Sequence, residues 1–568
     1  AVFTQLGIGF NNSVAQKRTI DIEFADVPVD AIEQPQRNII VCSLLGELKP
    51  TLDIMKILIQ HGHNVSLVAQ GEMSQILVEY PKIHRYPLGF IIDSRSPNYR
   101  DMYLEKYSLQ HAIRERQVAY DVYTNAYRTY TKVAVERAID LFVCDANSHD
   151  ACVDAAWTMK KPVVMIGSSL ESASDTRVPY KPEFTFGCDV SMEHSPFFER
   201  LWCSMIMPAR IMYAMYPLMK TINEQRRELG IEPVSDRHER TRNVLFLANT
   251  FFGFEVAQPL SPMYREVGPI MSDKYPDLDT PLREFLLTHE KTVYISLGSR
   301  AYLSQKNNGI ILQSILESIN AKIFDGVIWS FGQTTLDDFP PTIILPSSNS
   351  VVNVSQVLHA HPHIMVTKGL SQQFATLNHS HIRVFLTNGG TESIYEGLYT
   401  ATPMLTLPIL PSDSANTQRL LNHRNLAHTL SKDSLTVAEI TRKINILLTD
   451  PSIRANAKRM QFLSSINGKR KRYAAELIEY VLFSAAQSSM NDEIKTNVFP
   501  EWETPDRRMG WIKGSNLDVV TFVGGLMLSV IVMITYALWN FVDIVEKIST
   551  LVVSKRTKTV AIGGCKRK

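Results

Sequence analysis

The part of the sequence best suited to chemistry is a double glycine between a hydrophobic strand and a helix. Residues 385–416 read FLTNGGTESIYEGLYTATPMLTLPILPSDSAN, which predicts a strand, the Gly389-Gly390 turn, a helix and a second strand. Glycines let backbone N–H groups approach an anion, and a helix that begins there points its positive end at the same place. Ser393 can add a hydroxyl donor, and Glu396 can accept from a pair of ribose hydroxyls. The segment predicts a nucleoside diphosphate site, with a plain strand–helix connector as the alternative.

Two halves of the chain repeat the alternation of strands and helices that builds a parallel α/β sheet. In the first half, hydrophobic runs predict strands at 38–45, 64–69, 140–145, 162–167 and 243–249. In the second half, they predict strands at 292–297, 327–331, 364–367, 384–387 and 403–407. Gly268-Pro269 and the polar stretch up to Pro281 predict a linker between the halves. Two facing Rossmann-like units would form a binding cleft at the carboxyl ends of both sheets.

A separate feature near the end of the chain concerns a membrane. Residues 519–542 contain no charged side chain over 24 positions, which is long enough to cross a hydrocarbon core of about 30 Å. The following residues are mainly basic, so the tail is expected in the cytosol and the large N-terminal part in a lumen or outside the cell. We therefore expect a single-pass type I protein of the endoplasmic reticulum or another endomembrane. No charged n-region or apolar run opens the chain, which indicates a removed signal peptide or a fragment.

Composition narrows the classes of function. Lys and Arg number 59 against 57 Asp and Glu, a net charge of +2 that gives no support for nucleic acid as a partner. The six cysteines show no CxxC or Cys/His zinc spacing, so no metal site is expected. Cys188 and Cys203 are candidates for a pair, whereas most of the cysteines are expected to be small buried hydrophobic residues.

The residues around the double glycine resemble the UDP-glycosyltransferase family, in particular its membrane-bound members with the GT-B fold. Residues 249–270 resemble the family's passage between domains, and the sequence from Ser296 to Ser299, which includes Gly298, resembles the first loop of its C-terminal domain. The single C-terminal span with a basic tail also fits. The signature spacing is kept at Thr387, Gly389, Gly390, Ser393, Glu396, Pro403, Pro408 and Asn416.

The resemblance implies transfer of a sugar from a UDP-sugar to a small, usually apolar acceptor held by the N-terminal domain. It implies that Gly389, Gly390 and Ser393 contact the diphosphate and that Glu396 contacts the ribose. Gln373 stands where the family has a glutamine near the uracil. The UDP-sugar is then a co-substrate, and neither a cofactor nor a metal is required, because a helix dipole and hydrogen bonds can stabilise the leaving group.

The sequence departs from the family pattern at the site itself. Asn388 replaces a histidine, Glu392 replaces an asparagine, and the tryptophan expected beside the uracil is missing. The Asp-Gln pair that reads the donor sugar becomes Ser412-Asp413, so Asp413 is the candidate at that place. The histidine expected as general base is Glu47.

Two of these departures change the charge of the site. The Glu392 carboxylate favours the helix dipole in an empty site but repels a diphosphate unless a cation intervenes. Arg300, next to Ser299, can supply that cation, or it is a solvated surface arginine. Glu47 either deprotonates the acceptor hydroxyl, with Asp145 as the family's orienting aspartate, or only caps the following helix.

We therefore expect an inverting hexosyltransferase that acts on a hydroxyl of a small lipophilic acceptor. The alternative is a catalytically silent family member that binds a ligand or regulates a partner. Self-association and association with another protein both stay open. The expected parts are an N-terminal extension (1–37), an acceptor domain (38–268), a linker (269–281), a UDP-sugar domain (282–490), a juxtamembrane segment (491–518), a transmembrane helix (519–542) and a basic cytosolic tail (543–568).

Overall fold

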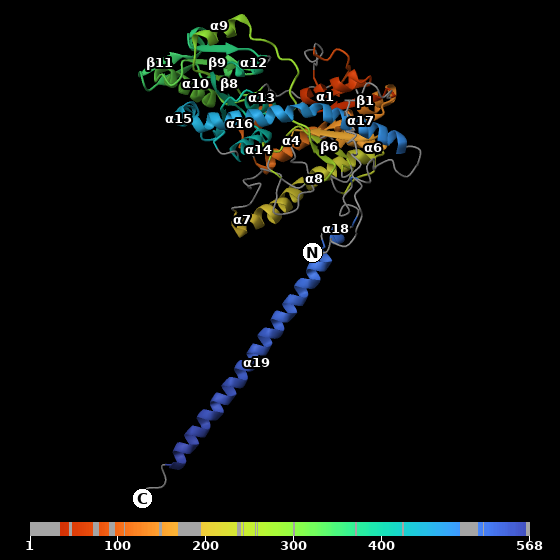
Figure 1. The fold of residues 1–568 in the computed structure, drawn as a ribbon, viewed down its shortest axis with the longest axis vertical. Coiled ribbons are helices and arrows are strands. Elements are labelled where there is room, and N and C mark those ends of the chain that lie inside the picture. Colours follow the sequence, from red (N-terminus) through yellow and green to blue (C-terminus); the bar gives the residue numbers. More distant parts are fainter. Residues whose placement is uncertain are drawn as a thin grey trace, which may run out of the picture.

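The computed structural model describes residues 35–563 apart from 45–47, 72–78, 90–96, 107, 147–149, 169–194, 236–239, 242–243, 256, 258–259, 299–301, 370–371, 423–424, 489–501, 503–508, 510 and 515. Two parallel sheets form the body, and a long helix leaves it (Figure 1). The sequence-based prediction of two Rossmann-like α/β units is confirmed.

The N-terminal sheet has the strand order β3-β2-β1-β4-β5-β6-β7, with every neighbouring pair parallel. The order reverses between β1 and β4, and parallel sheets of this kind form a crevice at the carboxyl ends of the strands on either side of the reversal. The strands are β1 (Asn38–Ser43), β2 (Asn64–Ala69), β3 (His84–Pro87), β4 (Leu141–Asp145), β5 (Val163–Gly167), β6 (Leu245–Ala248) and β7 (Tyr264–Glu266).

Both faces of this sheet are covered, which explains why its strands are continuous hydrophobic runs. Along β1, Ile39 and Val41 pack into the core on one face, whereas Ile40 and Cys42 pack into the core on the other. The helices of this unit are α1 (Leu48–Gln60), α3 (Pro97–Leu104), α4 (Leu109–Asp121), α5 (Tyr123–Glu136), α6 (Asp150–Thr158), α7 (Phe197–Leu201), the π-helix η3 (Trp202–Ile206) and α8 (Met207–Glu228).

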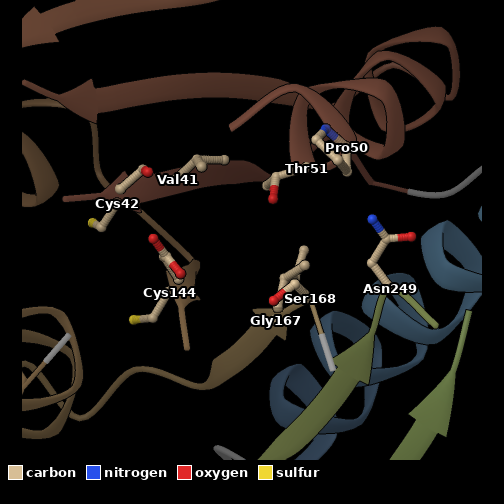
Figure 2. Close-up of a pocket in the computed structure, with 11 residues that line it drawn as sticks. Val41, Cys42, Pro50, Thr51, Cys144, Gly167, Ser168 and Asn249 are labelled. Atoms are coloured by element: carbon tan, nitrogen blue, oxygen red, sulfur yellow. The ribbon is translucent and has the colours of Figure 1, made fainter. Parts of the chain in front are cut away.

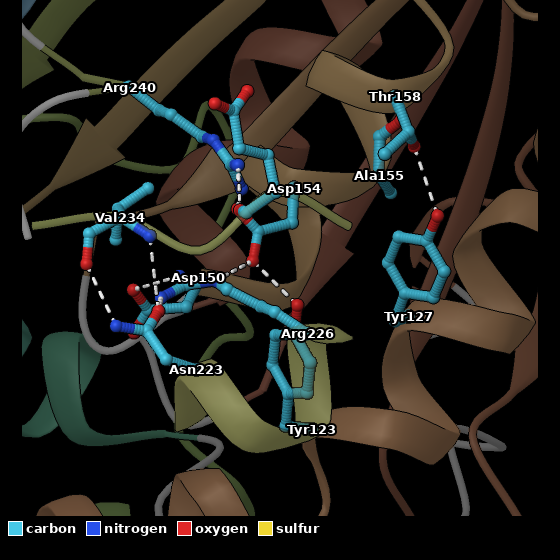
Figure 3. Close-up of polar contacts among 11 residues, drawn as sticks. Tyr123, Tyr127, Asp150, Asp154, Ala155, Thr158, Asn223, Arg226, Val234 and Arg240 are labelled. Atoms are coloured by element: carbon cyan, nitrogen blue, oxygen red, sulfur yellow. Dashed lines mark hydrogen bonds and ion pairs between the residues drawn. The ribbon is translucent and has the colours of Figure 1, made fainter. Parts of the chain in front are cut away.

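A buried ionic cluster fixes the C-terminal end of α8 to the body (Figure 3). Arg226 Nε lies 2.7 Å from Asp154 Oδ2 on α6, and its Nη2 lies 3.3 Å from Asp150 Oδ1. The Tyr123 hydroxyl donates to the same Asp154 Oδ2 at 2.6 Å, and Arg240 forms an ion pair with Asp154. Because each charge is paired and hydrogen-bonded, the cluster compensates for the desolvation of its members and holds α8 at a defined angle.

The C-terminal sheet has the order β12-β9-β8-β13-β14-β15, again with parallel neighbours. Its strands are β8 (Thr292–Ser296), β9 (Gly326–Ser330), β12 (Ile364–Thr367), β13 (Ile382–Thr387), β14 (Met404–Thr406) and β15 (Ala427–Thr429), and β10 (Thr342–Leu345) and β11 (Ser350–Asn353) form a separate hairpin. The helices are α9 (Thr280–Thr288), α10 (Gln305–Asn320), α11 (Val354–Ala360), α12 (Gln373–Leu377), α13 (Thr391–Tyr399), α14 (Pro411–Asn422), α15 (Val437–Thr449) and α16 (Pro451–Asn467).

Helix α17 (Lys471–Ser488) does not stay with the C-terminal unit, in which the sequence analysis placed residues up to 490. It crosses back and packs against α1 (Figure 1), so Ala474 and Ile478 lie in the core of the N-terminal unit. The Glu479 carboxylate is shared by His61 Nδ1 at 2.8 Å and His63 Nε2 at 3.2 Å. The apolar face of α17 was visible in the sequence, but nothing local indicated which sheet it covers.

Beyond α17, α18 (Trp511–Gly514) precedes α19 (Leu517–Gly563), which extends away from the body (Figure 1). An 18-residue stretch within residues 517–554 has a mean hydropathy of 2.3, and that stretch is exposed in the structure. In the part of the chain that the structure describes, this is the one helix long and apolar enough to cross a membrane.

Candidate active site

A small pocket lies at the carboxyl edge of the N-terminal sheet, beside the reversal of strand order (Figure 2). The described atoms leave about 20 Å³ of space, room for one or two water molecules. Asp145 is the last residue of β4 at this edge, as the sequence analysis expected, and its side chain is half-buried. The polar residues that line the pocket are Ser43, Thr51, Asp145, Ser168 and Asn249.

A disulfide holds the strand end that carries Asp145. Cys144, the residue before Asp145, is bonded to Cys152 on α6, with the two Cα atoms 5.9 Å apart. The expectation that most cysteines are buried hydrophobic residues is therefore wrong for this pair. The two cysteines are eight residues apart, and this spacing alone did not indicate a disulfide. Cys203 is also disulfide-bonded, whereas Cys188 lies outside the described residues.

Asn249 is a site residue that the sequence analysis missed. Its Oδ1 accepts from the Ile270 N–H at 2.8 Å, and its backbone oxygen accepts from the Tyr395 hydroxyl on α13 at 2.5 Å. The side chain is buried and lines the pocket, and its Nδ2 has no hydrogen-bond partner among the described residues. An unpaired buried donor is costly, so this amide is suited to donate to an oxygen of a bound molecule. The sequence marked this position only as the end of a hydrophobic strand.

The double-glycine turn follows β13 in the C-terminal unit. Gly389 has φ +97°, and a Cβ there would lie 2.9 Å from Thr417 Oγ1 and 3.0 Å from the Asp413 carbonyl oxygen. Both the backbone angle and the space therefore require glycine. The Asn416 amide donates to the Gly389 oxygen at 3.1 Å, which fixes the turn against α14. Gly390 is the N-cap of α13, so the first N–H groups of that helix, which have no partner within the helix, lie beside the turn.

The structure brings together three residues that the sequence analysis placed at the donor site. Gln373 Nε2 on α12 donates to Ser393 Oγ at 3.1 Å and to Glu396 Oε2 at 2.8 Å. Gln373 is buried, and in the described part of the chain its Oε1 has no hydrogen-bond partner. The unpaired Oε1 lies near the first turn of α13 and the Glu396 carboxylate. A polar ligand such as a nucleotide could donate a hydrogen bond to it.

Burial raises the pKa of Glu396 to about 7, and the like charge of Glu392 acts in the same direction. The hydrogen bond from Gln373 and the charge of Lys49 oppose this rise of the pKa. Glu392 itself is exposed in the first turn of α13. The donor site thus holds two carboxyl groups whose charge has to be offset when a diphosphate binds.

Lys49 of the N-terminal unit is a cation near this site that the sequence analysis did not single out. It stands on α1, 3.6 Å from Glu79, and its ammonium lies 5.8 Å from the centroid of the Tyr275 ring. Tyr275 in turn stacks on Phe374 beside Gln373, with ring centroids 4.0 Å apart. Lys49 therefore reaches towards the donor site from across the cleft. Arg300, the expected cation, and Ser299 lie outside the described residues, as does Glu47.

Asp413 occupies a different place from the one expected for a residue that reads the donor sugar. Its carboxylate is buried and accepts from the N–H groups of Ile409 at 3.3 Å and Leu410 at 2.9 Å. Burial raises the pKa of Asp413 to about 6, although hydrogen bonds, including one from Asn388, oppose this. The carboxylate forms its hydrogen bonds within the protein, because the chain just before α14 bends so that its N–H groups point at Asp413. Its direct role in sugar recognition is therefore not supported.

Asn388 and Gly298 meet beside the glycine turn. A Cβ at Gly298, where φ is +89°, would lie 3.2 Å from the amide atoms of Asn388. Asn388 is buried, and none of the residues that the structure describes forms a hydrogen bond with its Oδ1. The loop after β8 and the turn after β13 thus pack closely, as expected for neighbouring parallel strands whose carboxyl ends share an edge.

The chain is similar in sequence to one protein family and to several characterised relatives. The family described as "UDP-glucoronosyl and UDP-glucosyl transferase" matches residues 175–484, more than half of the chain. The chain is 25% identical to a UDP-glycosyltransferase of Talaromyces amestolkiae over 516 residues, 86% of this chain and 95% of the relative. It is 23% identical to UDP-glycosyltransferase FPY2 of Fusarium mangiferae over 548 residues, 89% of this chain and 99% of the relative.

Solved structures agree on the fold. The crystal structure of the glycotransferase of kitacinnamycin has a TM-score of 0.54 and 17% sequence identity, covering 78% of this chain and 99% of the other. That likeness establishes the GT-B arrangement of two parallel-sheet units. The matched region contains the glycine turn and the contacts of Gln373 with Ser393 and Glu396. The chain therefore belongs to the UDP-glucuronosyl and UDP-glucosyl transferase family.

Proposed function

We propose that this UDP-glycosyltransferase moves a hexosyl group from a UDP-sugar to a hydroxyl of a small lipophilic acceptor, with inversion at the anomeric carbon. The observation that carries the donor half is the set of contacts from Gln373 to Ser393 and Glu396, next to a turn where only Gly389 fits. The diphosphate would accept from the N–H groups at the start of α13. Glu396 would accept from the ribose hydroxyls, and the orphaned Gln373 Oε1 would face the uracil side.

The reacting hydroxyl of the acceptor, rather than the whole acceptor, is proposed to lie at the pocket of Asp145 and Asn249, because that pocket has room for only one or two water molecules. Glu47 takes the proton from the acceptor hydroxyl, and the hydroxyl oxygen forms the new bond to the anomeric carbon. The bond between that carbon and the diphosphate oxygen breaks, and UDP leaves with its electron pair. Backbone N–H groups and the dipole of α13 stabilise the charge on the leaving diphosphate. Asp145 orients Glu47 or raises its pKa through like charge.

We further propose that residues 519–542 anchor the enzyme in an endomembrane, with the body in the lumen. The basic tail supports this orientation through the positive-inside rule. The disulfide between Cys144 and Cys152 supports it independently, because disulfides persist in oxidising compartments. The apolar acceptor would then be drawn from, or returned to, the same membrane.

Direct binding tests the donor half. Full-length protein in lipid nanodiscs is titrated with UDP and, as a matched control, with ADP. We expect UDP to bind at micromolar to low millimolar concentration and ADP to bind much more weakly. Absence of UDP binding at millimolar concentration would remove the transferase proposal. Radiolabelled UDP-glucose, UDP-galactose and UDP-glucuronic acid, each with a panel of phenols and aliphatic alcohols, then identify the donor.

A catalytically silent family member is the second candidate. Two observations favour it: the Asp413 carboxylate accepts from the Leu410 N–H group and so is not free to bind the sugar, and the Glu392 carboxylate would repel an anionic donor. This candidate predicts ligand binding in the N-terminal pocket without sugar transfer from any donor in the panel. A single transferred sugar above the level of the Glu47→Gln variant would exclude it.

A further inference from the structure

The first part of the α7–η3–α8 helical segment exposes an unusual number of large apolar side chains. Phe198 is 79% exposed, Met212 73% and Tyr213 85%. Together the exposed residues form what we name the α7–α8 apolar face: Phe197, Phe198, Leu201, Trp202, Met205, Ile206, Met212, Tyr213 and Tyr216. Within it, Phe198, Trp202, Met205, Met212 and Tyr216 are spaced by four, three, seven and four residues, that is by one or two turns, so they lie along one side of the helical segment.

This face has a fixed orientation. The opposite side of the same segment is buried, with Cys203, Met207, Leu218 and Ile222 against the body. The far end of α8 is held by the ionic cluster of Arg226 and Asp154 (Figure 3). The exposed stripe therefore cannot turn inward without breaking a buried ion pair. Large exposed apolar patches on a folded protein usually mark an interaction site.

The position of the face indicates its partner. In Figure 1, α7 lies at the end of the body from which α18 and α19 leave, and it reaches about the level of α18 along the long axis of the molecule. A bilayer that contains α19 would begin at about this level. The face therefore lies where the proposed anchor brings lipid, whereas α9 lies at the opposite end of the body.

The chemistry of the face fits a lipid surface. It is rich in Phe, Trp, Tyr and Met, and aromatic residues with a polar group favour the boundary between headgroups and acyl chains. Arg200 and Lys220 are exposed beside the stripe, and the Arg210 guanidinium lies 5.4 Å from the centroid of the Trp202 ring. Basic side chains at the edge of an apolar helix face can reach anionic headgroups while their stems cover apolar surface.

We infer that the α7–α8 apolar face inserts into the surface of the same bilayer that α19 spans, which gives the body a second membrane contact. The inference rests on the proposed membrane anchoring. Two contacts fix the tilt of the body, and they place the N-terminal unit, which holds the acceptor pocket, against the lipid. A lipophilic acceptor then has a short path from the bilayer to the pocket.

Depth-dependent fluorescence quenching tests this inference on the full-length protein. A single environment-sensitive fluorescent amino acid replaces Met212 on the face, Met533 in the span or Leu287 on α9, whose exposed fractions are 73%, 62% and 65%. Each protein is reconstituted at one copy per nanodisc of phosphatidylcholine and phosphatidylserine, with or without spin-labelled acyl chains. One copy per disc prevents self-association from covering the face.

We expect spin-labelled lipid to reduce the fluorescence at positions 212 and 533 on the order of twofold or more, and to leave position 287 unchanged, because an interfacial helix lies about 5–10 Å deep. Quenching at position 533 alone would overturn the second contact while leaving the anchor intact. Quenching at none of the three would overturn the anchor and the inference together. Equal quenching at 212 and 287 would show nonspecific contact of the body with lipid and would also overturn it.

Discussion

The carboxyl edges of the two sheets differ in the polar groups and the charge that they carry. The N-terminal edge presents small polar groups and the half-buried Asp145, and its backbone is fixed by a disulfide. The C-terminal edge is dominated by carboxyl groups, and the pKa values of Glu396 and Asp413 are both raised by burial. Under the proposed function, donor binding at the C-terminal edge therefore depends on how its negative charge is compensated, and chemistry at the N-terminal edge depends on the position of the base.

The largest expected effect separates the two edges by function. Glu47→Gln should lower single-turnover transfer about 1,000-fold, within the usual range for loss of a general base, and leave UDP affinity unchanged. Rapid-quench assays measure the first quantity and calorimetry the second. Glu136→Gln, at an exposed carboxylate on α5, is the control and should behave like the wild type. Normal transfer by Glu47→Gln would mean that this carboxylate only caps α1.

The next effect concerns the charge of the C-terminal edge. A carboxyl group whose folded pKa lies above its unfolded value favours the folded state at low pH, and this advantage is lost as the pH rises through the folded value. For Glu396, with a folded pKa of about 7, the free energy of unfolding should fall by up to about 3 kcal/mol between pH 4.5 and pH 7.5.

Thermal unfolding of the full-length protein in nanodiscs across this range measures the effect. Glu396→Gln should flatten the curve near pH 7. Asp413→Asn should instead flatten it below pH 6, because the pKa of Asp413 is raised only to about 6. A wild-type midpoint that does not change between pH 6 and pH 7.5 would contradict the raised pKa of Glu396.

A third prediction tests the steric basis of the donor turn. Gly389→Ala should cost about 2 kcal/mol of stability, because it forces a residue with a Cβ into positive φ and against Thr417. Affinity for UDP should fall at least tenfold. Gly390→Ala is the matched control, since its Cβ would meet nothing closer than 3.7 Å and its φ is −60°. If both variants bind UDP equally well, the turn does not hold the diphosphate.

The smallest effect tests whether one edge compensates the charge of the other. Lys49→Met should weaken UDP binding by about tenfold, roughly 1.4 kcal/mol, because it removes the cation that opposes Glu392 and Glu396. Lys56→Met on the same helix, where Lys56 is paired with Asp273, should have no such effect. Adding Glu392→Gln to Lys49→Met should restore most of the lost affinity. No difference between the two lysine variants in calorimetry would leave Lys49 without this role.

Much of the donor site could be predicted from sequence because its requirements are local. A tight turn with positive φ needs glycine at 389, and a helix N-terminus three residues from a strand end follows from chain order. Gln373 was assigned only through family resemblance, as a residue near the uracil, and its hydrogen bond to Glu396 was not predicted. The environment of Asp413 could not be predicted, because its sequence position is the same whether the carboxylate is exposed or turns back onto the Leu410 N–H group.

The sequence by itself determined the two α/β units, the glycine turn and an apolar segment long enough for a membrane, since hydrophobic period and backbone sterics act between neighbouring residues. The tertiary structure alone decided that α17 returns to the N-terminal unit, that Cys144 pairs with Cys152, and that Lys49 faces the donor site. It also decided that the α7–α8 apolar face stays uncovered by the body. These outcomes depend on which surfaces meet after the chain has folded, and residues distant in sequence carry no local signal of that meeting.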